Sequence, residues 1–405
     1  MDRRTLLGAM MAATLPFPAY AGQCRDAVDN AADMRWLIDQ VEEHYAYLPD
    51  RHIDIAKLRA IYIAEAQAVC EPHAFLGALE RLIAELHDHH IEANVNNAAS
   101  PQLVPTGTEL WAAFHDGNAV IEAVRPGSAC AEAGVRAGDT VIAIGDDPVD
   151  EAVAAAMPRA LNAPDPEAND YALRVLLAGT HNKPRDFTLK GKKHIVLAPF
   201  ERQPSDTLLT TTHHGAVAVL RVENSLGDSG LVAEVDKALD HLDGAKAVVL
   251  DLRNTPSGGN TDVAEPILGR FIKGRPGYQR GFLPGRRRSF PKDGYTRWVR
   301  ARGTTVTLPM AVLCSRWTGS MGEGMTIGLD GMKRAIVVGT RMAGLCGATR
   351  QFLLPKSQIG MTFPVERLYH LDGTPRQKWV PPHLVDLATA RGDDPILAKA
   401  LELLA

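Results

Sequence analysis

The stretch "AKAVVLDLRNTPSGGNTDVAEPILGRFI" (residues 245–272) decides the class of fold. It opens on a continuous apolar run, which is typical of a parallel strand that is buried on both faces. A turn with two adjacent glycines, Gly258 and Gly259, follows, and then a segment with the apolar spacing of a helix. A strand followed by a helix is the repeating unit of an α/β domain, so we expect a mostly parallel sheet covered by helices.

The flanking segments continue this alternation. Upstream, "AVAVLRVEN" (216–224) predicts a strand and "GLVAEVDKALDHLDG" (230–244) predicts an amphipathic helix. Downstream, "TVTLPMAVLC" (305–314) and "RAIVVGT" (334–340) predict two more strands with a helix between them.

Two segments lack this periodicity. Residues 200–214 are polar and predict a linker. The basic segment 273–302 is rich in Gly and Pro and predicts an exposed loop, with a docking surface or a substrate lid as the alternative.

The part before residue 200 has a different character. Residues 28–95 show helical spacing, and short predicted strands follow, beginning with "LWAAFHDG" (110–117). The first 21 residues combine a twin arginine, Arg3-Arg4, with a short apolar run and Ala19-Tyr20-Ala21. This pattern predicts a twin-arginine signal cleaved after Ala21, and a periplasmic or secreted protein, with a retained anchor as the alternative.

Composition limits the function classes. The chain has 405 residues, 45% hydrophobic and 23% charged, with a net charge of −4. This predicts two or three domains, no nucleic-acid partner, and no integral membrane segment once the signal is removed. None of the five cysteines has a metal-ligand spacing, so we expect no metal and no cofactor. Cys24 and Cys70 are candidates for a disulfide in an oxidising compartment.

The candidate nucleophile lies in "CSRWTGSMGEGMTIGL" (314–329). Ser320 follows a β-rich run, is flanked by glycine, and precedes a predicted helix. A serine at such a turn can be a nucleophile if a base takes its proton. The alternative is an ordinary helix N-cap, a position that serine favours.

One segment resembles a PDZ domain. The run "PGSACAEAGVRAGDTVIAIGDDPV" (126–149) carries this likeness, which covers roughly residues 104–195. The resemblance implies a groove that takes an extended peptide by strand addition, and a spacer that binds nothing is the alternative.

The order of four motifs behind that segment resembles the tail-specific, or C-terminal processing, serine peptidases of family S41. The motifs are "DLRNTPSGG" (251–259), "SRWTGSMGEG" (315–324), "RAIVVGT" (334–340) and "YHLDGTP" (369–375). The resemblance implies an α/β fold with a ClpP/crotonase-like core, a PDZ-like domain and an N-terminal helical domain. The implied boundaries are a signal over residues 1–21, helices over 22–100, the PDZ-like domain over 101–200 and the core over 201–405.

The same resemblance assigns the site. It places the nucleophile at Ser320 and a matching acid at Glu323. It places the oxyanion hole on the amides of Gly258 or Gly259 and of Met321.

The chain departs from the processing proteases at their catalytic lysine. That position reads Leu345, and leucine cannot accept a proton. The tricorn-like branch uses a histidine from an "L-x-D-x-H" run instead, and "LHDHH" (86–90) matches it with His90. The glutamate of that branch has Gln377 as its nearest counterpart, so Glu366 or Glu323 is left as the candidate to orient His90. A metal cluster and a solvated helix end are the alternatives for "HDHH".

We therefore expect an exported serine endopeptidase that cleaves polypeptide, including C-terminal tails, through an acyl-enzyme on Ser320 with His90 as general base. The alternative is an inactive S41-like protein that binds a peptide or another ligand. A hydrolase of small esters or amides is a third hypothesis.

Overall fold

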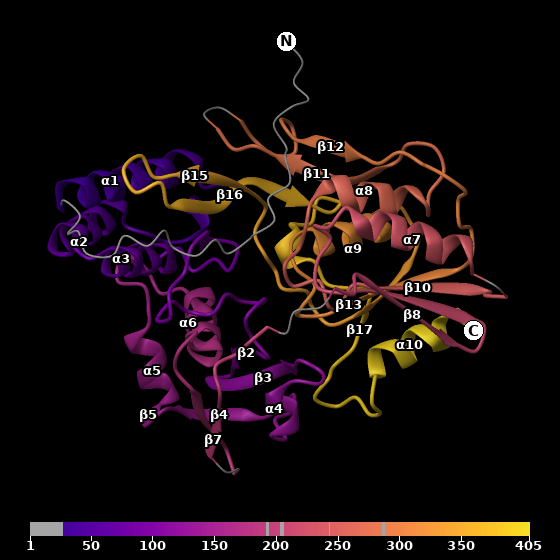
Figure 1. The fold of residues 1–405 in the computed structure, drawn as a ribbon, viewed down its shortest axis with the longest axis horizontal. Coiled ribbons are helices and arrows are strands. Elements are labelled where there is room, and N and C mark those ends of the chain that lie inside the picture. The colour runs from indigo at the N-terminus through magenta and orange to yellow at the C-terminus, as the bar shows by residue number, and fades with distance from the viewer. Residues whose placement is uncertain (1–26, 192–193, 203–205, 243, 286–287) are drawn as a thin grey trace. The chain divides into compact units, whose positions relative to one another are not determined.

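The computed structural model describes residues 27–191, 194–202, 206–242, 244–285 and 288–405. Contacts divide these residues into two compact units (Figure 1). The core unit comprises residues 206–345 and Leu368–Ala405. The N-terminal unit comprises residues 27–202 and Cys346–Arg367, so a late segment of the predicted core packs with the early part of the chain.

The core unit contains the predicted parallel sheet. Its six strands follow the order β17-β14-β13-β10-β9-β8, and neighbours are parallel except for the antiparallel pair β8 and β9. The strands are β8 (Leu209–His214), β9 (Val217–Val222), β10 (Ala247–Asp251), β13 (Met310–Cys314), β14 (Ile336–Gly339) and β17 (His383–Leu384).

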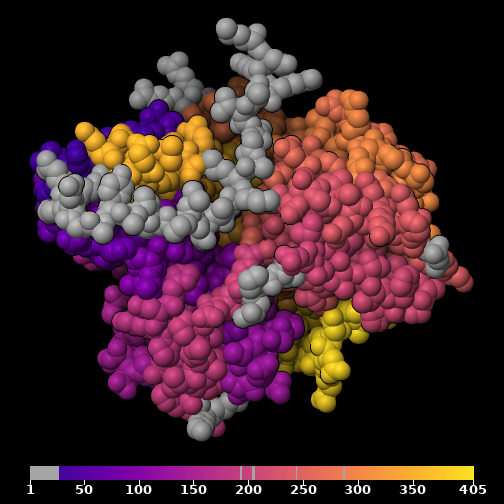
Figure 2. Space-filling model, viewed as in Figure 1, coloured from indigo at the N-terminus to yellow at the C-terminus, as the bar shows by residue number. Residues whose placement is uncertain are grey.

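Helices cover both faces of this sheet (Figure 1). Val248 and Leu250 of β10 pack in the cluster formed with α7 (Gly230–Asp240), α8 (Thr261–Gly269) and α9 (Met321–Gly331). Val249, between them, packs in the opposite cluster with α10 (Pro395–Leu404), whose yellow residues reach the surface in Figure 2. Burial on both faces explains why β10 reads as an unbroken apolar run.

The basic segment 273–302 is not simply a loop. It contains β11 (Gly277–Phe282) and β12 (Tyr295–Trp298), which pair antiparallel. Tyr278 is fully buried against Gly328 of α9. The exposed-loop prediction is therefore wrong for these two strands. The glycines of the segment suggested a loop, whereas Tyr278 is buried and packs on α9.

The N-terminal unit begins with helices that pack on a small sheet. The elements are α1 (Ala27–His44), the 3₁₀ turn η1 (Leu48–Asp50), α2 (Ile55–Ala68), α3 (Pro72–Ala84), β1 (Glu92–Ala93), β15 (Ala348–Leu353) and β16 (Gly360–Tyr369). β16 pairs antiparallel with both β1 and β15, and Phe363 packs among the helices. The N-terminal helices are confirmed, but residues 45–54 and 85–95 are not α-helical, and the first of these segments contains η1.

The second part of this unit is an antiparallel sheet with short helices. Its order is β2-β3-β4-β6-β7, and β5 pairs with β4. The elements are β2 (Leu110–His115), β3 (Asn118–Val124), α4 (Ala129–Glu132), β4 (Thr140–Ile144), β5 (Asp147–Pro148), α5 (Val149–Ala155), α6 (Pro166–Ala178), β6 (Arg185–Leu189) and β7 (His194–Leu197). This region occupies the place of the predicted PDZ-like domain, whose boundaries stay predictions.

Other sequence predictions have mixed outcomes. The linker over 200–214 is wrong from Leu209 onward, because β8 is an edge strand whose threonines and histidines face outward and leave no apolar alternation. The signal over residues 1–21 and Cys24 lie outside the described residues. In the described part of the chain, no helix is long and apolar enough to cross a membrane.

Candidate active site

Ser320 lies between β13 and α9, directly before Met321, the first residue of the helix. Its backbone has φ +46° and ψ −106°, a conformation that residues with a Cβ rarely adopt. Strain of this kind costs about 1–3 kcal/mol and persists only where the surroundings enforce it. The surroundings of Ser320 therefore hold its backbone in a strained turn at the N-cap position of α9.

Hydrogen bonds between two loops enforce that turn. The loop after β10 and the loop after β13 share the carbonyl of Leu252, which accepts from the hydroxyls of Thr255 (2.8 Å) and Thr318 (2.9 Å). The amide of Gly319 in turn donates to the carbonyl of Thr255 at 3.1 Å. Both threonines are fully buried. Their hydrogen bonds therefore hold the backbone that precedes Ser320 in place.

The two glycines of the sequence motif bring backbone close to Ser320. A Cβ on Gly258 would lie 2.4 Å from Cβ of Ser320, and one on Gly259 would lie 2.2 Å from the carbonyl carbon of Leu226. Both glycines also have positive φ, +66° and +146°. Only glycine fits here, because a side chain would overlap the serine or the backbone of Leu226.

Two amides beside Ser320 have no acceptor among the residues that the structure describes. They belong to Gly259 and to Met321, the first residue of α9, whereas the amide of Gly258 donates to Thr255 O at 3.0 Å. The amide nitrogen of Met321 lies 3.3 Å from the point that a Cβ on Gly258 would occupy. Unbonded amides next to a serine can stabilise a developing oxyanion.

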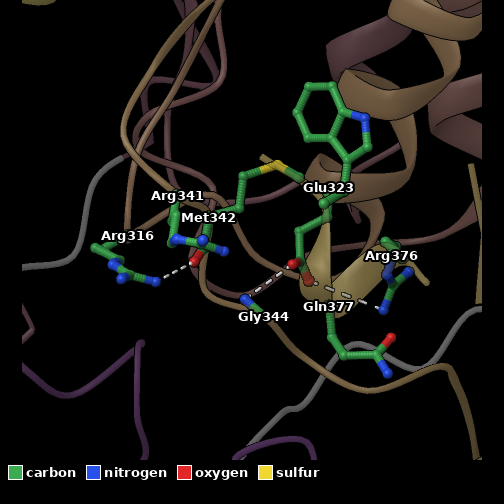
Figure 3. Close-up of a pocket in the computed structure, with 8 residues that line it drawn as sticks. Arg316, Glu323, Arg341, Met342, Gly344, Arg376 and Gln377 are labelled. Atoms are coloured by element: carbon green, nitrogen blue, oxygen red, sulfur yellow. Dashed lines mark hydrogen bonds and ion pairs between the residues drawn. The ribbon is translucent and has the colours of Figure 1, made fainter. Parts of the chain in front are cut away.

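Glu323 holds the serine turn from inside α9. Its side chain is fully buried, and its carboxylate accepts the amide of Ser320 and the amide of Gly344, each at 2.9 Å. The guanidinium of Arg376 lies 3.8 Å away (Figure 3). Burial raises the pKa of Glu323 to about 7, against the opposing effects of Arg376 and of the amides. Glu323 therefore positions the nucleophile through its backbone.

The pKa of Glu323 predicts a pH-dependent stability. Between the ordinary value of 4.5 and about 7, the unfolded chain has lost the proton that the folded protein keeps, so the free energy of unfolding falls as pH rises. We expect wild type to lose on the order of 3 kcal/mol over this window relative to Glu323→Gln, whose side chain does not titrate. Urea unfolding of both proteins across the window measures the difference. Parallel curves would mean that the amides keep the carboxylate ionised.

Leu345, which the resemblance places at the position of the family lysine, is a buried residue. Leu345 is 4% exposed, and its carbonyl accepts from Arg376 at 2.9 Å. Gln377, the predicted nearest counterpart of the family glutamate, follows Arg376 in the 3₁₀ turn η2 (Arg376–Lys378) and lines a small cavity with Glu323 (Figure 3). Sequence reasoning did not assign a role to Arg376 or to Arg316 in this cavity. The sequence signal was that Arg316 lies within the motif 315–324 and that Arg376 directly follows the motif 369–375.

The structure brings Ser320, Gly258, Gly259, Met321 and Glu323 together in the core unit. The other two predicted site residues, His90 and Glu366, lie in the N-terminal unit.

His90 is held by its ring and its backbone. Nδ1 lies 2.5 Å from the carbonyl oxygen of Cys346, and the His90 amide donates to Asp88 at 2.9 Å. Asp88 also accepts the hydroxyl of buried Tyr45 at 2.8 Å. Because a carbonyl only accepts, Nδ1 carries a proton, and a neutral His90 then has its lone pair on Nε2. This is the tautomer that a general base requires.

The neighbouring residues have other roles. His89 stacks on Tyr171, with ring centroids 4.5 Å apart, and its Nε2 has no hydrogen-bond partner in the described part of the chain. Burial holds the pKa of His89 well below its usual value, so the ring is neutral. Glu366 lies in β16 opposite Ala348. Among the described residues, no group of three or more His, Cys, Asp or Glu side chains is arranged to hold a metal.

Comparisons with known proteins concern the family and the fold. Residues 216–385 match the model of peptidase family S41. Mature CPAF has a similar fold, with a TM-score of 0.59, 14% identity, and 93% of this chain and 96% of that chain covered. The photosystem II D1 C-terminal processing protease has a TM-score of 0.57 and 18% identity, with 92% and 97% covered.

At these identities the structural likeness concerns the fold. No curated protein matches the sequence. The family match spans the glycine pair, the strained serine turn and Gln377, all of which lie between residues 216 and 385. This segment of the chain, residues 216–385, is thus similar to peptidase family S41.

Proposed function

We propose that the protein is a serine endopeptidase that cleaves polypeptide through an acyl-enzyme on Ser320. The observation that carries the proposal is the strained backbone of Ser320 beside the amides of Gly259 and Met321. Acyl transfer requires a nucleophile and hydrogen-bond donors that stabilise the oxyanion, and these groups supply both.

The reaction follows from these groups. Nε2 of His90 takes the Oγ proton as Oγ forms a bond with the scissile carbonyl carbon, and the oxyanion is held by the amides of Gly259 and Met321. The imidazolium then gives that proton to the leaving amine, the C–N bond breaks, and the acyl-enzyme remains. Water, deprotonated by His90, releases the acid and restores Ser320.

The choice of His90 as the base has two supports. Leu345 stands at the position of the lysine that the processing proteases use, and its buried side chain cannot take a proton. His90 has the ring tautomer of a base, because Nδ1 donates to Cys346 O. On this reading the protein belongs with the histidine-dependent, tricorn-like members of the family.

The remaining parts of the proposal concern access and location. We assign the region β2–β7 the role of a PDZ-like domain that receives extended polypeptide, and C-terminal tails are the candidate substrate. We assign residues 1–21 the role of a twin-arginine export signal, which makes the mature protein periplasmic or secreted. No metal or organic cofactor takes part.

A second function has one observation in its favour. Gln377 replaces the glutamate of the tricorn-like pattern, and an amide does not orient an imidazolium as a carboxylate does. A protein that kept the fold and lost the chemistry would bind peptide without turnover.

Labelling with a fluorophosphonate separates the two functions. We expect intact-mass spectrometry of the chain from Gly22 onward to show one covalent adduct, because only an activated serine reacts with this probe. Peptide mapping should place the adduct on Ser320. An unlabelled protein, in a sample where a control serine hydrolase is fully labelled, would favour the binding function.

A further inference from the structure

A second cavity, of about 390 Å³, lies in the core unit away from Ser320. Its walls come from the segments that follow α8 and α9 and from the segment that precedes β13. The parallel strands β13 and β14 begin at this edge of the sheet, whereas Ser320 follows the other end of β13. Binding sites for small molecules usually have volumes of about 300–1,000 Å³, so this cavity is large enough to hold a ligand of its own.

The walls of this cavity combine apolar and cationic side chains. The apolar ones belong to Ile272, Pro276, Val306 and Met332. The cations are Lys273, Lys333 and Arg334, and no acidic residue lines the cavity in the part of the chain that the structure describes. Walls of this kind suit a ligand that has both a negative charge and an apolar part.

Arg334 holds the walls together. Its Nε donates to Phe271 O at 2.6 Å, and its Nη2 donates to Val306 O at 2.9 Å and to Leu308 O at 2.8 Å. These bonds join the segment after α9 to the other two walls, so the cavity is formed before a ligand binds.

The same guanidinium is left with one open nitrogen. Nη1 forms no hydrogen bond with the described residues, and no carboxylate among them pairs with Arg334. Partial burial lowers the pKa of Arg334, because burial disfavours the charged form. An anion at Nη1 would offset this cost of burial.

Lys333 occupies a position that usually belongs to glycine. It has φ +56°, and the amides of Lys333 and Arg334 donate to Asp330 O at 2.8 Å and to Leu329 O at 2.9 Å. This is the Schellman pattern that ends a helix, in which the left-handed residue is most often glycine. The side chains of Lys333 and Lys273 are exposed and bond to no other described residue. The chain thus accepts an unfavourable backbone conformation at a residue that adds charge beside the cavity.

We propose that this cavity binds an aliphatic carboxylate, with the acid group on the three cations and the chain on the apolar wall. An inorganic anion would leave the apolar wall in water, and a neutral chain would leave the cations unpaired. Since α9 has 11 residues at about 1.5 Å each, it separates the cavity from Ser320 by roughly 16 Å. The ligand is therefore distinct from the substrate of the proposed peptidase, and the inference does not rest on that function.

Calorimetric titration of the chain from Gly22 onward with octanoate tests this inference. We expect millimolar or tighter binding, at least tenfold weaker binding of octanamide, and none of inorganic phosphate at the same concentration, because a hydrogen bond to a charged group is worth about tenfold or more. From butyrate to octanoate, each added CH₂ group should tighten binding by about fourfold, the effect of its transfer out of water.

Three variants assign the binding to this cavity. Lys333→Gly and Lys273→Gln should each weaken octanoate binding about threefold, since an ion pair of an exposed lysine contributes little. Lys333→Gly should unfold at no lower urea concentration than wild type, because glycine suits φ +56°, so a loss of folding cannot explain the weaker binding. The control is Lys246→Gln, an exposed lysine that precedes β10 and lies outside the cavity, and it should bind octanoate as wild type does.

Four results would overturn the proposal. They are a failure of octanoate to bind in the millimolar range, equal affinities for octanoate and octanamide, equal affinities for octanoate and phosphate, and octanoate binding that neither Lys333→Gly nor Lys273→Gln weakens. The charge-dependent and length-dependent affinity, lost in these two variants and kept in Lys246→Gln, would establish the site.

Discussion

Replacing Ser320 with alanine is expected to lower kcat/KM for peptide hydrolysis by a factor on the order of 10⁴ or more. The reason is the loss of the Oγ atom that forms the acyl bond, while the amides of Gly259 and Met321 and the carboxylate of Glu323 stay in place. The same variant should no longer gain a fluorophosphonate adduct. Steady-state kinetics and intact-mass spectrometry check the two effects.

A matched glycine variant controls for folding. Alanine keeps the strain of φ +46°, whereas glycine adopts positive φ at little cost. We expect Ser320→Gly to be as inactive as Ser320→Ala but more stable by about 1 kcal/mol in urea unfolding. Residual turnover of either variant near the wild-type level would remove Ser320 from the mechanism. Equal stability of Ser320→Gly and Ser320→Ala would contradict the presence of backbone strain at this position.

The second large effect is expected at His90. The variant His90→Ala should lower kcat/KM by a factor on the order of 10²–10⁴, because proton transfer by a positioned base contributes that much. Added imidazole should restore part of the rate, since a small base can enter the space left by the ring. Rates with and without imidazole are compared in wild type and variant.

His213→Ala is the control for His90. His213 is an exposed histidine of β8, so its removal should change neither the rate nor the response to imidazole. Full activity of His90→Ala would exclude it as the base. A reduced rate that imidazole does not improve would instead indicate a structural role through Cys346 and Asp88.

The sequence was most informative where periodicity and burial coincide. β10 and the glycine turn after it were predicted because a strand buried on both faces is apolar at every position. The helix after Ser320 was predicted as well, and the structure shows that all its residues from Met321 to Leu329 are buried. The placement of the serine next to the glycine pair came from the order of motifs and not from periodicity.

Other features depend on contacts between distant residues. The strain at Ser320 arises because loops about sixty residues apart bond to one carbonyl, that of Leu252. The cavity beside Glu323 combines arginines from three separate segments, and each alone resembles a solvated side chain. No local pattern in a sequence reports such a meeting of charges.

The edge strand β8 also bears on how the protein behaves at high concentration. Four of its residues, from Thr211 to His214, are exposed, and it is the last strand in the order of the core sheet. An edge strand offers its outer amides and carbonyls to any other extended chain, and apolar edges lead to aggregation and fibrils. The exposed threonines and histidines keep this edge hydrated. The exposed polar residues of β8 thus help to keep the protein in solution at high concentration.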